Sequence, residues 1–339
     1  MRTLRLGLAG LGHGRTLLQA NLPEFADLPV RVTAVCETNT ELMASMAAQY
    51  GVEWTTTDYD ALVAREDLDI IGIYTPGPLH CEQILKALDA GKHVMVTKSM
   101  VYSMAEVEQV VAAVDRTGLT LLVTQSLRGR LDFMDAKRAC DAGEIGELFM
   151  AEAHYVHDLR PVYRATPWRT AMPQDLILGG ACHPIDLLRW FMGDIEAVHC
   201  VGLRSGVAPE YPQEDCFFIN VRFTSGMVGR AANLLGMVHP HGERANGLTV
   251  YGTKGTIRDN VKTLDAAGDL PQRAYVTELP PHSGHAGEMI VMLGHMADCV
   301  LIGTTPWVGV REGARVVSTG LAAWESLRTG RAVKVRNEF

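Results

Sequence analysis

Short uninterrupted hydrophobic runs alternate with amphipathic segments through the first part of the chain. Residues 69–74 form one such run, which ends at Thr75-Pro76-Gly77-Pro78 because these residues cannot continue a helix. Residues 81–90 then carry apolar side chains at helical spacing. Residues 93–97 form a second buried run, followed at once by Lys98. Strands that alternate with helices in this way predict a doubly wound parallel sheet.

The pattern changes after residue 146, where strand-like segments follow one another with few helices between them. This predicts a larger, mainly antiparallel sheet, so we expect an α/β chain with a second, α+β domain. The first domain is expected over residues 1–127 and the second over residues 128–339, with the final helix able to pack back on the first. The stretch 259–287 is rich in turn residues and is predicted to be mostly loop. The expected strands cover residues 147–157, 195–204, 215–223, 227–235, 248–251, 274–279 and 332–335, and the expected helices cover residues 132–142, 184–191, 288–302 and 311–328.

A glycine-rich turn follows the first hydrophobic run. Gly10 and Gly12 have the spacing of the first two glycines in the dinucleotide-binding fingerprint, where the backbone turns tightly and a pyrophosphate can approach it. Arg15 occupies the third glycine position, so the match is incomplete. Glu37 ends the next strand, where a carboxylate takes the ribose hydroxyls and repels a 2′-phosphate. The pattern favours NAD over NADP; a solvated charge at a strand end is the alternative for Glu37.

Polar residues gather where the predicted parallel strands end. Lys98 follows one strand, and Gln125, Ser126 and Arg128 follow another. Because ligands of open α/β sheets bind at this carboxyl edge, Lys98 is either the centre of a site or a surface residue.

The segment around His183 carries the sharpest chemical signal of the second half. Gly179 and Gly180 are expected to break the preceding segment and Pro184 suits a first helical turn, so His183 is expected at or near the N-cap. Asp186 can share a helix face with His183. The helix N-terminus disfavours an imidazolium and Asp186 favours it, so the imidazole could accept a proton near neutral pH. A capping histidine paired with its own helix is the alternative.

Composition excludes several classes of protein. The chain has 339 residues, 47% of them apolar and 21% charged, as in ordinary globular proteins with two domains. The net charge of −8 argues against a nucleic-acid partner. No apolar run approaches a membrane span, and the N-terminus lacks the pattern of a secretion signal. Seven scattered cysteines indicate reduced core thiols in a cytoplasmic protein. An exposed sheet face would favour a homodimer or homotetramer.

Several motifs together resemble the Gfo/Idh/MocA family, named for glucose–fructose oxidoreductase, inositol dehydrogenase and a rhizopine-catabolism protein. The resemblance spans essentially the whole chain, with the motifs in order and at family-like separations. It implies an N-terminal Rossmann domain and a C-terminal α/β domain whose open sheet commonly mediates oligomerisation. It also implies NAD(P)-dependent chemistry at a carbinol carbon of a sugar, cyclitol or related molecule. The matching residues are 10–14, Glu37, Thr75, Pro76, His80, 90–94, Lys98, 183–190, 251–256, Gly284, His285 and Glu288.

The resemblance also implies roles for individual residues. Lys98 matches the lysine that contacts the reacting hydroxyl beside the nicotinamide, and His183 matches the histidine commonly assigned as general acid/base. Asp186 matches an aspartate placed near the substrate or as an orienter of the histidine. The expected cofactor-binding residues are Gly10, Gly12, His13, Gly14, Glu37, Thr75, Pro76, His80, Lys98 and Gln125.

Three positions depart from the family pattern. Thr97 and Ser99 stand where the family usually has Glu and Pro, and Gly179 stands where many of its dehydrogenases carry an aspartate that partners the histidine. These changes alter the charges around the lysine and the histidine. Either another acid substitutes, such as Asp175 or Asp158, or the histidine works without its usual partner, or the redox step serves a different overall reaction.

Residues 154–169 are predicted to form a loop of the second domain, and we call them the substrate stretch. Their polar side chains suit a polyhydroxylated substrate, and their arginines hint at a carboxylate or another anion. A solvated connection is the alternative. His239 and His241 are expected on a surface loop. His282 and His285 with Glu288 have superficial metal spacing but match a helix start of the family, so no metal site is expected. The expected substrate-binding residues are His157, Arg160, Tyr163, Arg164, Trp168, Arg169 and His183.

The sequence thus favours an NAD(H)-dependent oxidoreductase acting on a carbinol carbon of a sugar, sugar acid or cyclitol. One alternative, motivated by Thr97 and Gly179, is a redox-neutral NAD-dependent glycoside hydrolase or lyase of the same family. The other is a non-catalytic, nucleotide-binding regulator. Retention of both Lys98 and His183 argues against the regulator.

Overall fold

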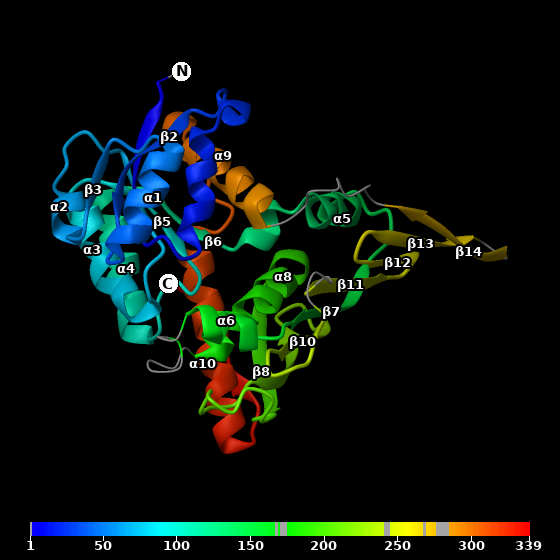
Figure 1. Cartoon of the computed structure of the whole chain (residues 1–339). Coiled ribbons are helices and arrows are strands. Elements are labelled where there is room, and N and C mark those ends of the chain that lie inside the picture. The colour runs from blue at the N-terminus through cyan, green and yellow to red at the C-terminus, as the bar shows by residue number, and fades with distance from the viewer. Residues whose placement is uncertain (1, 167–168, 170–174, 241–244, 267–268, 276–284) are drawn as a thin grey trace. The chain divides into compact units, whose positions relative to one another are not determined.

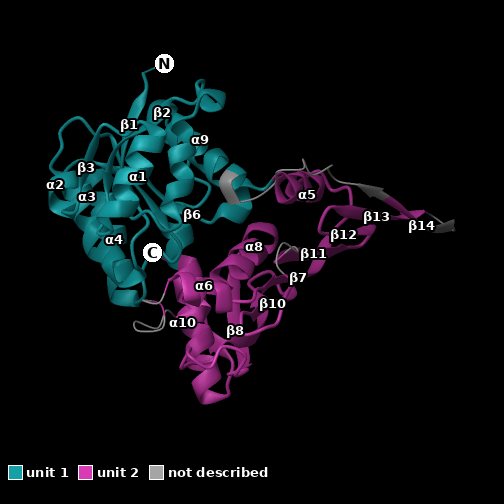
Figure 2. Ribbon diagram, in the orientation of Figure 1, with its two compact units in different colours: residues 1–130, 281–314, 339 teal, residues 131–280, 315–338 magenta. Residues whose placement is uncertain are grey.

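The computed structural model describes residues 2–166, 169, 175–240, 245–266, 269–275 and 285–339 (Figure 1). Contacts divide the chain into two compact units (Figure 2). Unit 1 holds residues 1–130, 281–314 and 339, and unit 2 holds residues 131–280 and 315–338. Each unit is therefore built from segments that are distant in the sequence.

Unit 1 contains a six-stranded sheet in the order β3-β2-β1-β4-β5-β6, and all of its strand pairs are parallel. The expected doubly wound sheet is confirmed. The strand order reverses between β1 and β4, and ligands of such sheets bind at that point of the carboxyl edge. The strands are β1 (Leu4–Ala9), β2 (Val30–Cys36), β3 (Trp54–Thr56), β4 (Ile70–Ile73), β5 (His93–Thr97) and β6 (Leu121–Thr124).

Helices connect these strands, and α4 (Met104–Thr117) has a capping residue at each end. Ser103 accepts a hydrogen bond from the Glu106 amide at 3.2 Å before α4, and Gly118 ends that helix at φ 66°. Three short 3₁₀ segments also line the carboxyl edge: η1 (Gly14–Asn21), η3 (Gly77–Leu79) and η4 (Ser126–Gly129). The other helical segments of the strand connections are η2 (Pro23–Phe25), α1 (Thr40–Tyr50), α2 (Tyr59–Val63), α3 (His80–Asp89) and α4 (Met104–Thr117).

Helix α9 (His285–Ile302) returns the chain to unit 1. Its buried Met289, Met292, Leu293 and Met296 join the core formed by the leucines of β1 and η1. The expected two-segment division at residue 127 placed this helix in the second domain. Hydrophobic spacing shows that a helix is buried but not which core buries it, so the return could not be read from α9 alone.

Unit 2 contains a nine-stranded sheet in the order β14-β13-β12-β11-β7-β10-β9-β8-β15. The β7–β10 pair is parallel and the other pairs are antiparallel, so the expected mainly antiparallel sheet is confirmed. Gly226, at φ 89°, makes the expected turn between β9 and β10. The strands are β7 (Leu148–Val156), β8 (Ile195–Leu203), β9 (Cys216–Phe223), β10 (Val228–Leu234), β11 (Asn246–Gly252), β12 (Gly255–Arg258), β13 (Val261–Ala266), β14 (Asp269–Tyr275) and β15 (Val333–Lys334).

The prediction of loop over residues 259–287 is wrong for its first part, because β13 and β14 form a hairpin there. The sequence of β13, VKTLDA, does not alternate between apolar and polar residues as a strand with one buried face would. In the structure, five of its residues are half-buried and one is exposed. The expected strand at 274–279 corresponds to the end of β14, and residues 276–279 lie outside the described part of the chain.

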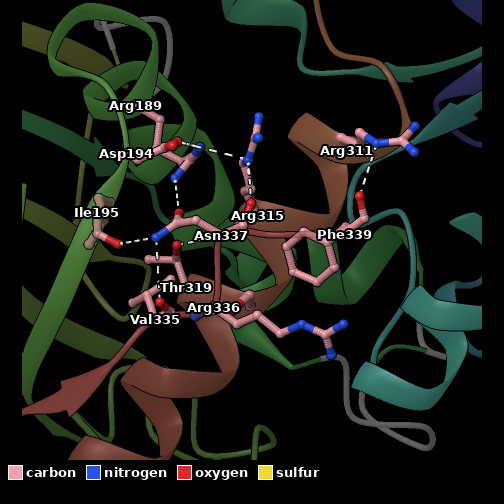
Figure 3. Close-up of polar contacts among 11 residues, drawn as sticks. Arg189, Asp194, Ile195, Arg311, Arg315, Thr319, Val335, Arg336, Asn337 and Phe339 are labelled. Atoms are coloured by element: carbon pink, nitrogen blue, oxygen red, sulfur yellow. Dashed lines mark hydrogen bonds and ion pairs between the residues drawn. The ribbon is translucent and has the colours of Figure 1, made fainter. Parts of the chain in front are cut away.

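In the sequence, the helices of unit 2 either precede β8 or lie near the end of the chain. They are α5 (Leu131–Asp141), α6 (Arg160–Ala165), the π-helical turn Ile177–Ala181, α8 (Cys182–Met192) and α10 (Val310–Thr329), whose residues 310–314 count with unit 1. Hydrogen bonds hold the C-terminal segment beside α10 (Figure 3). The Asn337 side chain donates to the Ile195 carbonyl at 2.8 Å and accepts from Arg189 Nη1 at 3.1 Å, and Arg315 Nε donates to the Asn337 carbonyl at 2.8 Å.

Candidate active site

The glycine-rich turn after β1 is shaped by close backbone approach. Gly10 has φ +90°, and a Cβ added there would lie 2.5 Å from the Tyr74 carbonyl oxygen. A Cβ on Gly14 would lie 2.8 Å from Tyr74 Cβ, whereas one on Gly12 would meet nothing within 4 Å. Gly14, not residue 15, therefore provides the close packing of the third fingerprint glycine. The open space beside Gly12 leaves its backbone accessible to a phosphate.

Glu37 lies at the same turn. It follows β2, and its Oε2 accepts a hydrogen bond from the Leu11 amide at 2.7 Å, while Oε1 accepts from the Asn39 amide at 3.0 Å. The carboxylate therefore lies between the glycine turn and the end of β2, where the sequence places the ribose contact. His13, on the same turn, is exposed, and its ring lies 6.3 Å from the Tyr74 ring.

His80 joins the two loops that follow β4 and β5. Its ring is buried, with Nδ1 2.8 Å from the Ser99 carbonyl oxygen and Nε2 3.0 Å from the Thr75 carbonyl oxygen. Burial lowers the pKa of the imidazole, and the neighbouring carbonyls oppose that shift. Because both ring nitrogens face backbone carbonyls, the role best supported for His80 is to hold these loops together.

Lys98 comes at the end of β5, as expected, and is half-buried. The peptide between Lys98 and Ser99 is cis. Gln125 is 2% exposed after β6, and Pro76 is half-buried after β4. The structure thus brings the expected cofactor residues to one edge of one sheet. Arg128, also at this edge, donates to the Trp307 carbonyl at 2.7 Å.

In unit 2, the substrate stretch continues from β7 into the helix α6, so the prediction of a loop is wrong for residues 160–165. Arg160 pairs with Asp158 through contacts of 2.6–3.2 Å, and this arginine holds the pKa of the Asp158 carboxyl below its usual range. Tyr163 is buried and stacks on Tyr211 at 5.6 Å. Because Asp158 neutralises its charge, Arg160 gives less support for the predicted binding of an anionic substrate. Arg164 is exposed, Arg169 is half-buried, and Trp168 lies outside the described residues.

His183 lies at the second position of α8, and both it and Asp186 are buried, at 7% and 1% exposure. The Tyr155 ring, on β7, meets the His183 ring edge-on at 5.3 Å. The expected helix start at Pro184 is wrong, because α8 begins at Cys182 and the π-helical turn leads into it. Gly179 and Gly180 are inside this turn and do not break it. A Cβ on Gly180 would lie 2.6 Å from Leu235 Cδ1, so glycine serves close packing there.

Asp175, one of the acids considered as a substitute partner for His183, caps the π-helical turn. Its Oδ1 accepts from the amides of Ile177 and Leu178 at 2.8 and 2.9 Å, and its Oδ2 accepts from Trp324 Nε1 at 2.6 Å. Trp324 and Asn233, which contacts the same turn, were missed by sequence reasoning. A polar residue among the apolar residues at the end of β10 was the available signal for Asn233.

Two further expectations concern histidines outside this site. His239 is half-buried on the loop after β10, and His241 and His282 lie outside the described residues, as does the side chain of His285. Among the described residues, no group of His, Cys, Asp and Glu side chains could hold a metal ion. Within the same residues, no helix combines the length and hydropathy needed to cross a membrane. All seven cysteines lie in the described part of the chain, where they are buried and form no disulfide.

Comparison with known proteins relates this arrangement to one family. A GFO/IDH/MocA model described as an oxidoreductase family with an NAD-binding Rossmann fold matches residues 4–125, and a GFO/IDH/MocA C-terminal domain matches residues 133–258. Levoglucosan dehydrogenase from Pseudarthrobacter phenanthrenivorans is 28% identical over 324 residues, 82% of this chain and 80% of that protein. The scyllo-inositol 2-dehydrogenase (NAD(+)) of Bacillus subtilis is 29% identical over 86% of this chain and 84% of its own length. A solved levoglucosan dehydrogenase with NADH and levoglucosan shares the fold, with a TM-score of 0.85 at 21% identity over 99% of this chain and 100% of that one.

Proposed function

Because the chain belongs to the Gfo/Idh/MocA oxidoreductase family, we propose that it is an NAD(H)-dependent oxidoreductase acting on a carbinol carbon of a sugar, sugar acid or cyclitol. The observation that carries the proposal is the parallel sheet of unit 1, whose carboxyl edge holds both the glycine turn and Lys98. The two curated relatives described above are named as dehydrogenases of levoglucosan and scyllo-inositol.

The residues at this edge fit a nicotinamide dinucleotide. The accessible backbone at Gly12 suits a pyrophosphate, and the Glu37 carboxylate suits the two ribose hydroxyls while repelling a 2′-phosphate. Thr75, Pro76 and Gln125 are the proposed contacts nearer the nicotinamide end. When bound, NAD supplies the acceptor for the hydride that leaves the oxidised carbon.

Lys98 and His183 have different proposed roles at the substrate hydroxyl. The Lys98 ammonium donates hydrogen bonds to the reacting oxygen and polarises it. His183 takes the hydroxyl proton during oxidation and returns it during reduction, as a general base and acid. For the buried Asp186, three residues further along α8, we propose a place near the substrate or a role in orienting the His183 imidazole.

We assign the remaining substrate hydroxyls to the polar residues between β7 and α8. The exposed Arg164 is the proposed anion contact if the substrate is a sugar acid, whereas Arg160 is paired with Asp158. Substrate contacts are proposed for His157, Arg160, Tyr163, Arg164, Trp168, Arg169 and His183.

We further propose a cytoplasmic homodimer or homotetramer that associates through the open face of the unit 2 sheet. Val201, Phe218 and Val228 are at least 41% exposed on one face of β8, β9 and β10, and Arg230 lies over the Phe218 ring at 5.3 Å. An apolar strip of this kind on a sheet is typical of a protein interface. Seven cysteines without a disulfide agree with a reducing compartment.

The proposal is tested with the purified protein in three steps. Mass and absorbance analysis identifies any co-purifying nucleotide, NADH formation at 340 nm is followed against sugars, sugar acids and cyclitols, and Lys98→Ala and His183→Ala are assayed on the substrate found. Stoichiometric NADH formation that both variants abolish supports the proposal. Bound nucleotide without net NADH, together with cleavage of a glycoside, would establish the redox-neutral reaction instead. Tight NAD binding without any chemistry would establish a regulator.

A further inference from the structure

Hydrogen bonds hold the π-helical turn that precedes α8 on two sides. On one side, the Asp175 carboxylate accepts hydrogen bonds from the first two amides of the turn, those of Ile177 and Leu178, and from the Trp324 indole of α10. The Gly179 amide also donates to the Asp175 carbonyl at 2.7 Å. Asp175 thus accepts hydrogen bonds from four donors that come from two elements of unit 2.

On the other side, Asn233 of β10 reaches the same turn. Its side chain is fully buried, and Nδ2 donates to the Leu176 carbonyl at 2.8 Å. The amide lies so close to the backbone that a Cβ on Gly180 would be 3.0 Å from Oδ1 and 3.1 Å from Nδ2. The buried amide of Asn233 therefore fixes the distance between the turn and β10.

His183 is the second residue after this turn and moves with it. Its ring meets Tyr155 of β7, whose neighbour in register on β10 is Asn233. The same strand pair therefore contacts both the turn and the histidine ring. The far end of α8 is held separately, through Arg189 and Asn337. An α-helix shifts as a stiff body, so a change at the turn changes where the imidazole lies.

We propose, on the premise of the proposed function, that Asp175, Trp324 and Asn233 are positioning residues that set the location and orientation of His183. A buried carboxylate is an expensive helix cap, because burial raises its pKa and a neutral Ser or Asn satisfies the same amides. A π-helical turn is also rare and concentrates at functional sites. Displacing a catalytic group by about 1 Å can cost about 100-fold in rate.

The decisive variant is Asp175→Asn, which keeps the shape and one oxygen acceptor for the two amides. Its NH₂ group then faces the Trp324 indole N–H, so two donors oppose each other and the turn must move. Trp324→Phe removes the indole donor. We therefore expect kcat to fall about tenfold or more in Asp175→Asn, with NADH affinity unchanged. The double variant should recover most of that loss towards the level of Trp324→Phe alone.

A second readout does not need turnover. With ¹⁵N-labelled histidine and His183→Asn for assignment, the imidazole cross-peak of His183 should shift in Asp175→Asn and return towards its original position in the double variant. Asp69→Asn in unit 1 is the matched control, since Asp69 also accepts a backbone hydrogen bond, from the Arg5 amide at 2.8 Å. The control should lower the melting temperature without moving the His183 signal.

An unchanged His183 signal and unchanged kcat in a folded Asp175→Asn protein would overturn the proposal, as would equal losses in the single and double variants. If Asp175→Asn does not fold, Asn233→Ser carries the test, and an unmoved signal there overturns the proposal. Should the wild-type protein oxidise no polyol, the proposed function fails, whereas the NMR comparison still decides whether these residues position His183.

Discussion

Lys98 and His183 are held in place by different kinds of structure. Lys98 directly follows a strand of a buried parallel sheet, and the loop after it is joined to its neighbour by the ring of His80. His183 follows a π-helical turn that depends on Asp175, Trp324 and Asn233, residues from three separate parts of the chain. The first arrangement arises from neighbouring loops and the second from distant contacts. We therefore expect substitutions far from the site to affect the position of His183 more than that of Lys98.

The largest effect is expected from the two residues themselves. His183→Ala and Lys98→Ala should each lower kcat about 10²- to 10⁴-fold, because each removes a proton-transfer or polarising group. Initial rates of NADH formation on the identified substrate measure this. His157→Ala, at a half-buried histidine of the substrate stretch, should mainly raise KM. Retention of full turnover in either of the first two variants would remove that residue from the assignment.

A large structural effect is expected at the glycine turn of unit 1. Gly14→Val should destabilise the protein by about 1–3 kcal/mol through overpacking, because even its Cβ would lie 2.8 Å from Tyr74 Cβ and 3.1 Å from Leu8 Cδ1. Gly12→Ala is the matched control, since a Cβ there meets no atom within 4 Å. Urea denaturation measures the difference. Equal midpoints for the two variants would show that Gly14 does not provide close packing.

The far end of α8 offers a way to separate the stability of the helix from its position. Asn337→Ala should lower the free energy of unfolding by about 1–2 kcal/mol, because it removes the acceptor for buried Arg189 and the donor for the Ile195 carbonyl. We expect kcat to change less than twofold, because the contacts of the π-helical turn remain. A loss of kcat as large as that of Asp175→Asn would show that both ends of α8 set the position of His183.

The smallest effect is a pH dependence at His80. Burial lowers its pKa in the folded state, so the unfolded chain binds the proton more readily, and this histidine makes the protein less stable as pH falls below about 6.5. His80→Gln should flatten that acid-side slope by at most about 1.4 kcal/mol per pH unit. Melting curves between pH 5 and 8 measure it, with exposed His13→Gln as the control. An unchanged slope would mean that folding does not lower the pKa of His80.

The sequence predicted the Lys98 region, which is built from local patterns, better than the His183 region, which depends on distant contacts. The strands of unit 1, the glycine spacing and Glu37 are local patterns, and the structure places them at one carboxyl edge. Gly179 and Gly180 were read as helix breakers, because glycine has the same appearance in sequence whether it ends a helix or allows close packing. The close approach of Gly180 to Asn233 joins residues more than 50 positions apart, so no local rule could find it. The third fingerprint glycine was misplaced by one residue for a similar reason, since Tyr74 defines it.

The way the chain passes between the units also decides how substrate specificity could be exchanged between relatives. Unit 2 comprises residues 131–280 and 315–338, and the stretch between them supplies α9 to the core of unit 1. A chimera made at a single junction near residue 130 would pair the donor's α9 with the recipient's β1 and η1, mixing the two halves of one core. Grafting specificity therefore requires two inserts that leave α9 with its own sheet.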